Sequence, residues 1–145
     1  MDQRDLRIIE LLRRNARIPK SKIARELGIT ETAVRKRIKK LEDSGVILGY
    51  RAIINYRKIN MVCSYTGIDV EPEALINTIR ELRKIKQIYS LYLTTGDHDI
   101  LVEIICNDIN ELEKIHSRIE QLPGIKRICP AIVTEIIELK DTEGS

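Results

Sequence analysis

Residues 20–41 are KSKIARELGITETAVRKRIKKL, and the spacing of small and apolar residues in this stretch predicts two helices joined by a tight turn. The first helix is expected to end at Gly28, because helices commonly end at a residue in the left-handed conformation, which only glycine adopts freely. Thr30 is a favoured N-cap for the second helix, over about residues 31–43. Ala24, four residues before Gly28, is small enough for the two helices to approach closely. This is the pattern of a helix-turn-helix.

The flanking segments complete a winged helix-turn-helix. Residues 2–14 place apolar side chains at helical spacing and begin at Asp2, another favoured N-cap. Residues 46–55 (VILGYRAIIN) have strand propensity, with Gly49 expected at a turn or bulge. The alternative is an ordinary helical hairpin with a basic face, and the spacing together with the charge favours the winged fold.

The charge of the chain is divided unevenly between its halves. Residues 1–60 hold 16 Lys and Arg against 7 Asp and Glu, whereas residues 61–145 hold 9 against 15. A basic half beside an acidic half indicates two modules, and a basic surface favours a polyanionic partner. We therefore expect residues 1–60, which include a linker strand, to form a DNA-binding domain. Residues 61–145 would instead hold an assembly together or bind something small.

The outward face of the helix over residues 31–43 is the candidate surface for double-stranded DNA, because a helix of this kind fits the major groove. Thr32, Arg35 and Lys36 are assigned to contacts with base edges. Lys39 and Lys40, further along the helix, are assigned to phosphates. Arg37 lies nearer the core edge, which suits a structural salt bridge or a phosphate contact. Acidic partners for this face look scarce, although a solvated helix face remains the alternative for any single lysine. The candidate residues are Thr32, Arg35, Lys36, Arg37, Lys39 and Lys40.

The second half has the element order βαββαβ, which is typical of a ferredoxin-like fold. The chain as a whole is therefore expected to be of the α+β class. Two helices cover one face of such a sheet, and we expect the other face to carry Ile and Val residues that a monomer leaves unshielded. That predicts a homodimer, which also suits a helix-turn-helix that spans two DNA half-sites. The expected strands cover residues 61–70, 87–95, 99–106 and 125–139, and the helices cover residues 71–85 and 108–122.

A set of residues and short motifs along both halves carries a family likeness: Asp5, Ile9, Leu12, Asn15-Ala16-Arg17, Ile23-Ala24, Leu27-Gly28, Arg37, Leu41, the run GVILGY at 45–50 and the turn TTGDHDILV at 94–102. On these residues, over about 2–139, the chain resembles the Lrp/AsnC (feast/famine) family of bacterial and archaeal transcription regulators. The resemblance implies dimers that often assemble to octamers. It also implies that residues 61–145 bind an effector, usually an amino acid, in a pocket between dimers near a Gly-x-x-Asp turn.

Carried over from the family, Gly96 and Asp99 would lie at the effector pocket. A glycine lets a backbone amide approach a ligand carboxylate, and Asp99 would either bind an α-ammonium group or cap the turn. Asp97 adds negative charge, which favours a basic effector such as lysine or arginine. Thr134, in the expected last strand, is a further candidate for lining this pocket.

Other functional classes fit the sequence poorly. Catalysis needs groups within hydrogen-bond reach of one another. The chain has only two histidines, of which His116 is expected on the surface of a charged helix, and it has no glycine-rich phosphate loop. Its three cysteines form no CxxC pair, so we expect neither disulfides nor a metal, and no cofactor. RNA binding through the sheet requires stacking aromatics, but Phe and Trp are absent and this half is acidic.

The sequence also indicates a cellular compartment. No apolar window is long enough to span a membrane, and the charged first twenty residues do not resemble a signal peptide, so a reducing, cytoplasmic location is expected. The function that emerges is a sequence-specific transcription regulator modulated by an amino acid. A DNA-organising protein with weak sequence preference and no effector remains the alternative.

Overall fold

The computed structural model describes residues 1–137. The chain forms two compact units, one over Met1–Ile53 and one over Ile54–Ile136. The short 3₁₀ helix η1 (Tyr56–Ile59) contacts the first strand of the second unit. Residues 54–60, which we expected to belong to the DNA-binding module, therefore group with the second unit.

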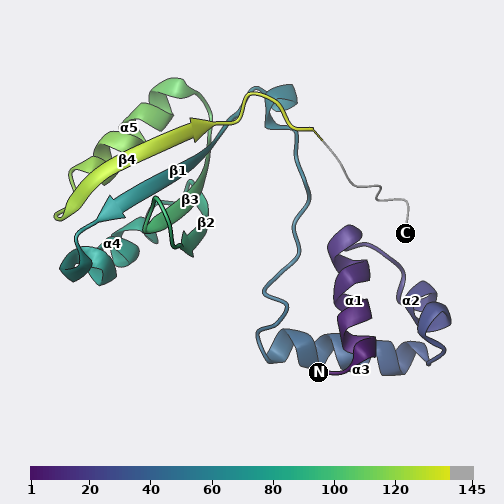
Figure 1. Cartoon of the computed structure of the whole chain (residues 1–145). Helices are drawn as coiled ribbons and strands as arrows, with labels where there is room; N and C mark the ends of the chain where they lie inside the picture. Colours follow the sequence, from purple (N-terminus) through teal and green to yellow (C-terminus); the bar gives the residue numbers. More distant parts are fainter. Residues whose placement is uncertain (138–145) are drawn as a thin grey trace. The chain divides into compact units, whose positions relative to one another are not determined.

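The first unit consists of three helices whose termini are set by local capping (Figure 1). At the start of α1, the carboxylate of Asp2 accepts a bond from the Asp5 N–H at 2.9 Å, and the Asp5 side chain accepts one from the Asp2 N–H at 3.3 Å. Thr30 caps α3 by accepting from the Ala33 N–H at 3.0 Å. Gly28 ends α2 at a φ of 66°. The helices are α1 (Gln3–Arg14), α2 (Lys20–Leu27) and α3 (Glu31–Asp43).

One apolar core joins the three helices. Ala24 of α2 is only 6% exposed, and its small side chain belongs to this core together with the inner stripe of α3. Burying each large aliphatic side chain contributes about 1.5–3 kcal/mol. The core therefore determines which face of α3 remains in solvent. Its buried residues are Ile8, Leu11, Ile18, Ile23, Ala24, Val34, Ile38 and Leu41.

The strand that we expected over residues 46–55 is not formed. The backbone of these residues is irregular, and Leu48 and Ile53 are 93% and 72% exposed. A strand needs a neighbouring strand to satisfy its backbone N–H and C=O groups, and the sheet of the described residues does not include this segment. Strand propensity reflects how well side chains fit a pleated surface, and it does not show whether a neighbouring strand is present to pair with.

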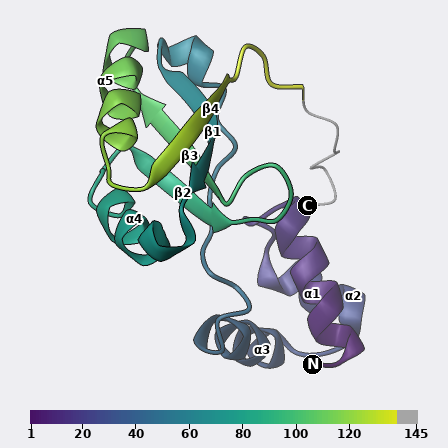
Figure 2. The same ribbon diagram turned by 60° about the vertical axis from the view of Figure 1, so that its left-hand side comes forward.

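The second unit is the expected ferredoxin-like βαββαβ fold. Its sheet is antiparallel throughout, with the strand order β2-β3-β1-β4. Helices α4 and α5 lie on the same face of the sheet in both views (Figures 1 and 2). The last strand ends at Ile132, before the expected end at residue 139, and residues 138 and 139 of that expectation lie outside the described residues. The elements are β1 (Val62–Val70), η2 (Pro72–Ala74), α4 (Leu75–Leu82), β2 (Ile88–Leu93), β3 (Ile100–Cys106), α5 (Ile109–Glu120) and β4 (Ile125–Ile132).

The helix-covered face of the sheet holds most of the buried Ile and Val residues, contrary to our expectation for the open face. Ile68 of β1 and its pairing partner Ile100 are fully buried in the core with Leu82 of α4 and Leu112 of α5. Side chains alternate between faces along a strand. The open face therefore carries a mixed set instead: Cys63, Tyr65, Gly67, Asp69, Tyr92, Leu101, Glu103, Ile105, Arg127, Cys129 and Ala131.

His116 lies inside the unit, although we expected it on the surface of α5. It is 8% exposed, and its Nε2 lies 2.8 Å from Oγ1 of Thr66. The Thr66 hydroxyl lies in turn 3.0 Å from Oγ of Ser64. Burial lowers the pKa of His116 below its ordinary value. The sequence held a signal: His116 follows Leu112 by four residues, on the apolar stripe of the helix.

None of the helices within residues 1–137 combines the length and the hydrophobicity that crossing a bilayer requires.

The buried imidazole makes the stability of the fold depend on pH. The unfolded chain protonates His116 near its ordinary pKa of about 6.5, whereas the folded protein does so at lower pH. The stability that the neutral ring contributes is therefore present above about pH 6.5 and is lost as the pH falls toward the folded pKa. Urea unfolding should show a smaller loss of stability between about pH 7.5 and about pH 5.5 in His116→Gln than in the wild type. An equal loss in both proteins would contradict this role.

Candidate DNA interface and effector turn

Helix α3 presents a polar face opposite its buried stripe. Val34, Ile38 and Leu41 are at most 6% exposed, and they hold the helix against α1 and α2. Residues three and four apart share a helix face, so the remaining positions point to solvent. The exposed residues on this face are Thr32, Arg35, Lys36, Lys39 and Lys40, as the sequence predicts, whereas Arg37 is half-buried.

Two of these cations have acidic partners on the same helix, although we expected such partners to be scarce. Arg35 lies 3.4 Å from Glu31, and Lys39 lies 3.1 Å from Asp43. Both are exposed pairs at a spacing of four residues, and such pairs contribute only about 0.3–0.5 kcal/mol. A phosphate group can therefore compete for these cations at small cost. Among the described residues, no ion-pair partner is seen for Lys36 or Lys40.

Arg37 forms the salt bridge that was one of its two expected roles. Its Nη1 lies 2.8 Å from a carboxylate oxygen of Asp2 and 3.0 Å from one of Asp5. The hydrogen bond from Arg37 lowers the pKa of Asp2 to about 2. The guanidinium therefore joins α3 to the capping box of α1. Its charge is thus compensated inside the unit, where it fixes α3 against the start of α1.

The expected effector turn connects β2 to β3. The Thr94 N–H donates to the Asp99 carbonyl at 3.0 Å, and the Thr94 hydroxyl donates to the His98 carbonyl at 2.8 Å. Gly96 has a φ of +92°, a conformation that favours glycine, and open space lies where a side chain would begin. Gly96 and Asp97 are both exposed. The turn is thus fixed at its base and presents these two residues to solvent.

The Asp99 side chain bonds to a neighbouring strand, whereas we expected it either to bind an α-ammonium group or to cap its own turn. Its Oδ2 accepts a bond from the Val70 N–H at 3.0 Å, and its own N–H donates to the Ile68 carbonyl at 3.1 Å. The aspartate therefore attaches the turn to the end of β1. This contact occupies one carboxylate oxygen, whereas no hydrogen bond or ion pair is seen for the Asp97 side chain among the described residues.

A second anchor of the turn was not found from the sequence. The ring of His98 lies directly over Gly67 of β1, where a Cβ atom on the glycine would come within 2.4 Å of it. Nδ1 of His98 lies 3.0 Å from Oδ1 of Asp69, and the other oxygen of that carboxylate accepts from Nε of Arg127 at 2.6 Å. These two partners lower the pKa of Asp69, with Arg127 the larger cause. The only sequence signal was a glycine inside a strand, which indicates a close approach.

Thr134 lies beyond the end of β4 and apart from the turn. Its carbonyl accepts a bond from Arg57, and the neighbouring Val133 N–H bonds to Cys63 near the start of β1. The turn is attached to Ile68 and Val70, at the opposite end of that strand. Within one chain the structure therefore does not bring Thr134 to Gly96 and Asp99. Our expectation depended on a longer last strand, and β4 ends at Ile132.

The described residues contain no group of three or more His, Cys, Asp or Glu side chains arranged to hold a metal ion. Burial raises the pKa of the thiols of Cys63 and Cys106, which keeps both protonated near neutral pH.

Comparison with known proteins agrees with this architecture. Residues 1–47 match the model of a winged helix-turn-helix DNA-binding domain. Residues 63–142 match the model of the Lrp/AsnC ligand binding domain. The chain belongs to the Lrp/AsnC family.

Relatives of this Lrp/AsnC protein share nearly its whole length. The HTH-type transcriptional regulator LrpA of Pyrococcus horikoshii is 42% identical over 137 residues, which cover 93% of this chain and 97% of that protein. The crystal structure of PH0061 has a TM-score of 0.84 at 22% identity, covering 97% of both chains. The regulator NMB0573 of Neisseria meningitidis, solved as an L-Met complex, has a TM-score of 0.73 at 19% identity and covers 98% of this chain and 95% of that one. The protein is a DNA-binding transcription regulator with a ligand-binding domain.

The pairing of Arg37 leads to a test that separates positioning from phosphate contact. Arg37→Gln should weaken binding to all DNA sequences while leaving the slope of log affinity against log salt unchanged, because no phosphate contact is lost. Lys40→Gln should reduce the slope by about 0.9 for each phosphate contact removed. Fluorescence anisotropy over a salt series would measure both. A slope that falls equally in the two variants would show that Arg37 binds phosphate.

The contact between His98 and Gly67 predicts a coupled pair of substitutions. Gly67→Ala should destabilise the protein by about 1–3 kcal/mol, because the new methyl group overlaps the imidazole. The double variant Gly67→Ala/His98→Ala should lose less stability than the sum of the single variants. Gly49→Ala is the control, since open space surrounds that position. Additive effects in urea unfolding would refute the proposed contact.

Proposed function

We propose that this regulator recognises specific DNA sequences through α3, works as a homodimer or a larger assembly up to an octamer, and changes its DNA binding when a small amino acid occupies the turn over residues 94–99. The observation that carries the proposal is the polar face of α3, which is held outward by the buried stripe and keeps Lys36 and Lys40 without ion-pair partners among the described residues.

Within this face, position along the helix suggests the division of roles. The N-terminal residues of a recognition helix reach base edges, and later residues meet the backbone. We assign Thr32, Arg35 and Lys36 to base contacts. Lys39 and Lys40 are assigned to phosphates. Each good bidentate contact to a base contributes about 1–3 kcal/mol of discrimination.

The open face of the sheet supports self-association. Tyr65 on the central strand β1 is 40% exposed and Tyr92 on β2 is 54% exposed, beside the half-buried Leu101 of β3. An apolar and aromatic sheet face that remains open is a candidate contact between copies. A two-fold dimer would also present two copies of α3 to DNA half-sites one helical turn apart.

The exposed part of the turn supports an amino acid effector. Gly96 leaves space for a ligand carboxylate to approach the backbone, and Asp97 offers a carboxylate without a partner among the described residues. NMB0573, which shares this fold, was solved with L-Met, so a ligand of this size is compatible with the fold. Lysine and arginine are our first candidates because Asp97 would attract a basic side chain. A DNA-organising protein without an effector is the alternative.

Calorimetric titration with each of the twenty amino acids tests the proposal, with DNA affinity and sedimentation measured with and without any ligand found. Lysine or arginine should bind and change the DNA affinity. Asp97→Asn should weaken that binding at least about tenfold, because a hydrogen bond to a charged group typically contributes about 1.5–3 kcal/mol. Glu73→Gln, an exposed carboxylate outside the turn, is the matched control. No heat with any amino acid, together with unaltered DNA binding, would favour the DNA-organising alternative.

A further inference from the structure

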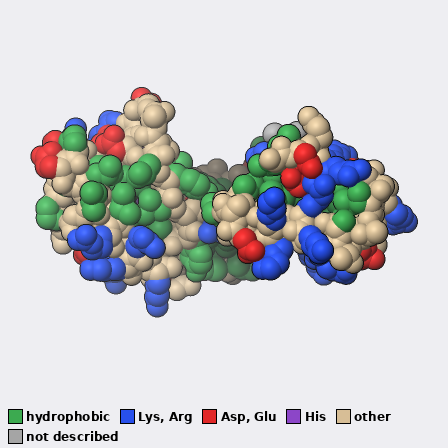
Figure 3. All heavy atoms as spheres, turned by 90° about the horizontal axis from the view of Figure 1, so that it is seen from below, with side chains coloured by type: hydrophobic (Ala, Val, Ile, Leu, Met, Phe, Trp, Pro, Cys, Tyr) green, Lys and Arg blue, Asp and Glu red, His purple; other side chains and the backbone are tan. Residues whose placement is uncertain are grey.

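The acidic half of the chain carries a concentration of positive charge on its helices. Six of the nine Lys and Arg residues in residues 61–145 lie on α4, on the segment that follows it, or on α5, and all six are exposed. In Figure 3, Lys and Arg side chains gather on the sheet unit beside a hydrophobic patch. We call this set the helix-layer cations: Arg80, Arg83, Lys84, Lys86, Lys114 and Arg118.

Most of the helix-layer cations lack acidic partners within the described residues. Lys84 pairs with Glu81 at 2.7 Å, and no hydrogen bond or ion pair is seen for the other five. The pKa of Glu81 is lowered first by Lys84 and further by the charges of Arg118 and Arg80. Cations of both helices therefore act on this carboxylate. Over residues 75–86 and 109–120 the six cations stand against Glu81, Glu111, Glu113 and Glu120, which leaves a small excess of positive charge in a unit whose overall charge is negative.

The helix dipole accounts for only part of this arrangement. Arg80, Arg83 and Lys84 lie at the C-terminal end of α4, where a cation gains about 0.3–1 kcal/mol. Lys86 lies beyond the helix, and Lys114 lies in the middle of α5. Like charges four residues apart on a helix destabilise it slightly, so Lys114 and Arg118 also oppose each other. A mobile or bound counter-charge would relieve that cost.

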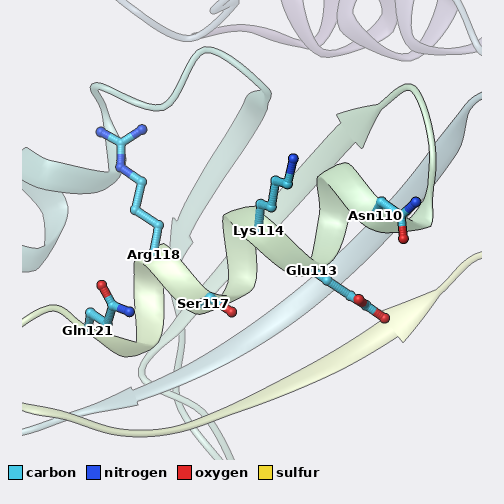
Figure 4. A pocket seen from close by; sticks show the side chains of 6 residues that line it. All are labelled: Asn110, Glu113, Lys114, Ser117, Arg118 and Gln121. Atoms are coloured by element: carbon cyan, nitrogen blue, oxygen red, sulfur yellow. The ribbon is translucent and has the colours of Figure 1, made fainter.

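The α5 surface shows how these side chains are presented. A shallow depression there is lined by Asn110, Glu113, Lys114, Ser117, Arg118 and Gln121. Figure 4 shows Lys114 and Arg118 extending to the same side of the helix, whereas Glu113 extends to the other. The depression is polar and open, so it offers charge without the enclosure that a small molecule needs. Such a surface suits an extended polyanion.

We propose that the helix-layer cations bind the phosphate backbone of DNA as a second contact that carries no sequence preference. The proposal rests on the proposed DNA binding through α3. A duplex presents one negative charge for about every 1.7 Å of its axis. Such a row of charges can contact several flexible cations at once, which a single small anion cannot do. DNA already held by α3 would also meet this surface at a high effective concentration. An acidic protein segment is the competing occupant, because Ile76 of α4 is 73% exposed beside the same cations.

The test uses the full chain and two duplexes of mixed sequence, one short enough for a single α3 site and one several helical turns long. Arg83→Gln/Arg118→Gln removes one unpaired cation from each region at little cost in helix propensity. On the long duplex it should make the slope of log affinity against log salt shallower by about 1.8, and on the short duplex it should change nothing. Lys58→Gln/Lys126→Gln is the control, with the same change of charge at exposed positions of the same unit outside α4 and α5.

Each outcome decides between separate claims. A shallower slope on the long duplex only, with the control unchanged, supports the second contact. A slope that matches the control overturns it and leaves the surface to an acidic protein partner, while DNA binding through α3 stands. If the wild-type chain binds neither duplex, the proposed function itself fails. Lys114→Gln, with an expected decrease of about 0.9, serves as the second variant if the double variant does not fold.

Discussion

The pairing of β1 on both of its edges is the constraint on which the ligand-binding unit depends. Because the strand lies between β3 and β4, its backbone is hydrogen-bonded along both edges, and its two faces carry different contacts. The inner face provides Ile68 to the core and Thr66 to the buried histidine. The outer face and the strand's end hold the turn, through Gly67 and the Val70 N–H. A shift in register by one residue would exchange these faces and remove every one of these contacts.

Helix α3, like β1, has one face in the core and another that carries different contacts, at the spacing of a helix instead of a strand. Its inner stripe is buried in the three-helix core, and its position against α1 is completed by the salt bridge from Arg37 to Asp2 and Asp5. The outer face is therefore oriented by groups that need not touch DNA. This separation lets the exposed residues vary with the DNA sequence recognised while the scaffold stays unchanged.

The helices could be predicted from the sequence because their limits depend on neighbouring residues. Asp2 and Thr30 cap helix starts and Gly28 ends a helix, and each does so through backbone groups a few residues away. Capping rules therefore find these helix ends from the sequence. What depends on distant residues was missed. The segment over residues 46–55 has strand-forming side chains, but it joins no sheet within the described residues. Thr134 follows a strand whose length is set by its neighbour. His116 was misplaced because its neighbours in sequence are charged, while its neighbours in space are two hydroxyls of β1.

The contact between Gly67 and His98 has a consequence for how such chains diverge. The imidazole occupies the volume that any side chain at position 67 would need, so the two positions share one space and cannot enlarge independently. A lineage that acquires a larger residue at 67 must first accept a smaller one at 98, and it then loses the histidine's link to Asp69. The two positions should therefore change together among descendants of this sequence, and the size of the residue at 67 should indicate which anchor holds the turn.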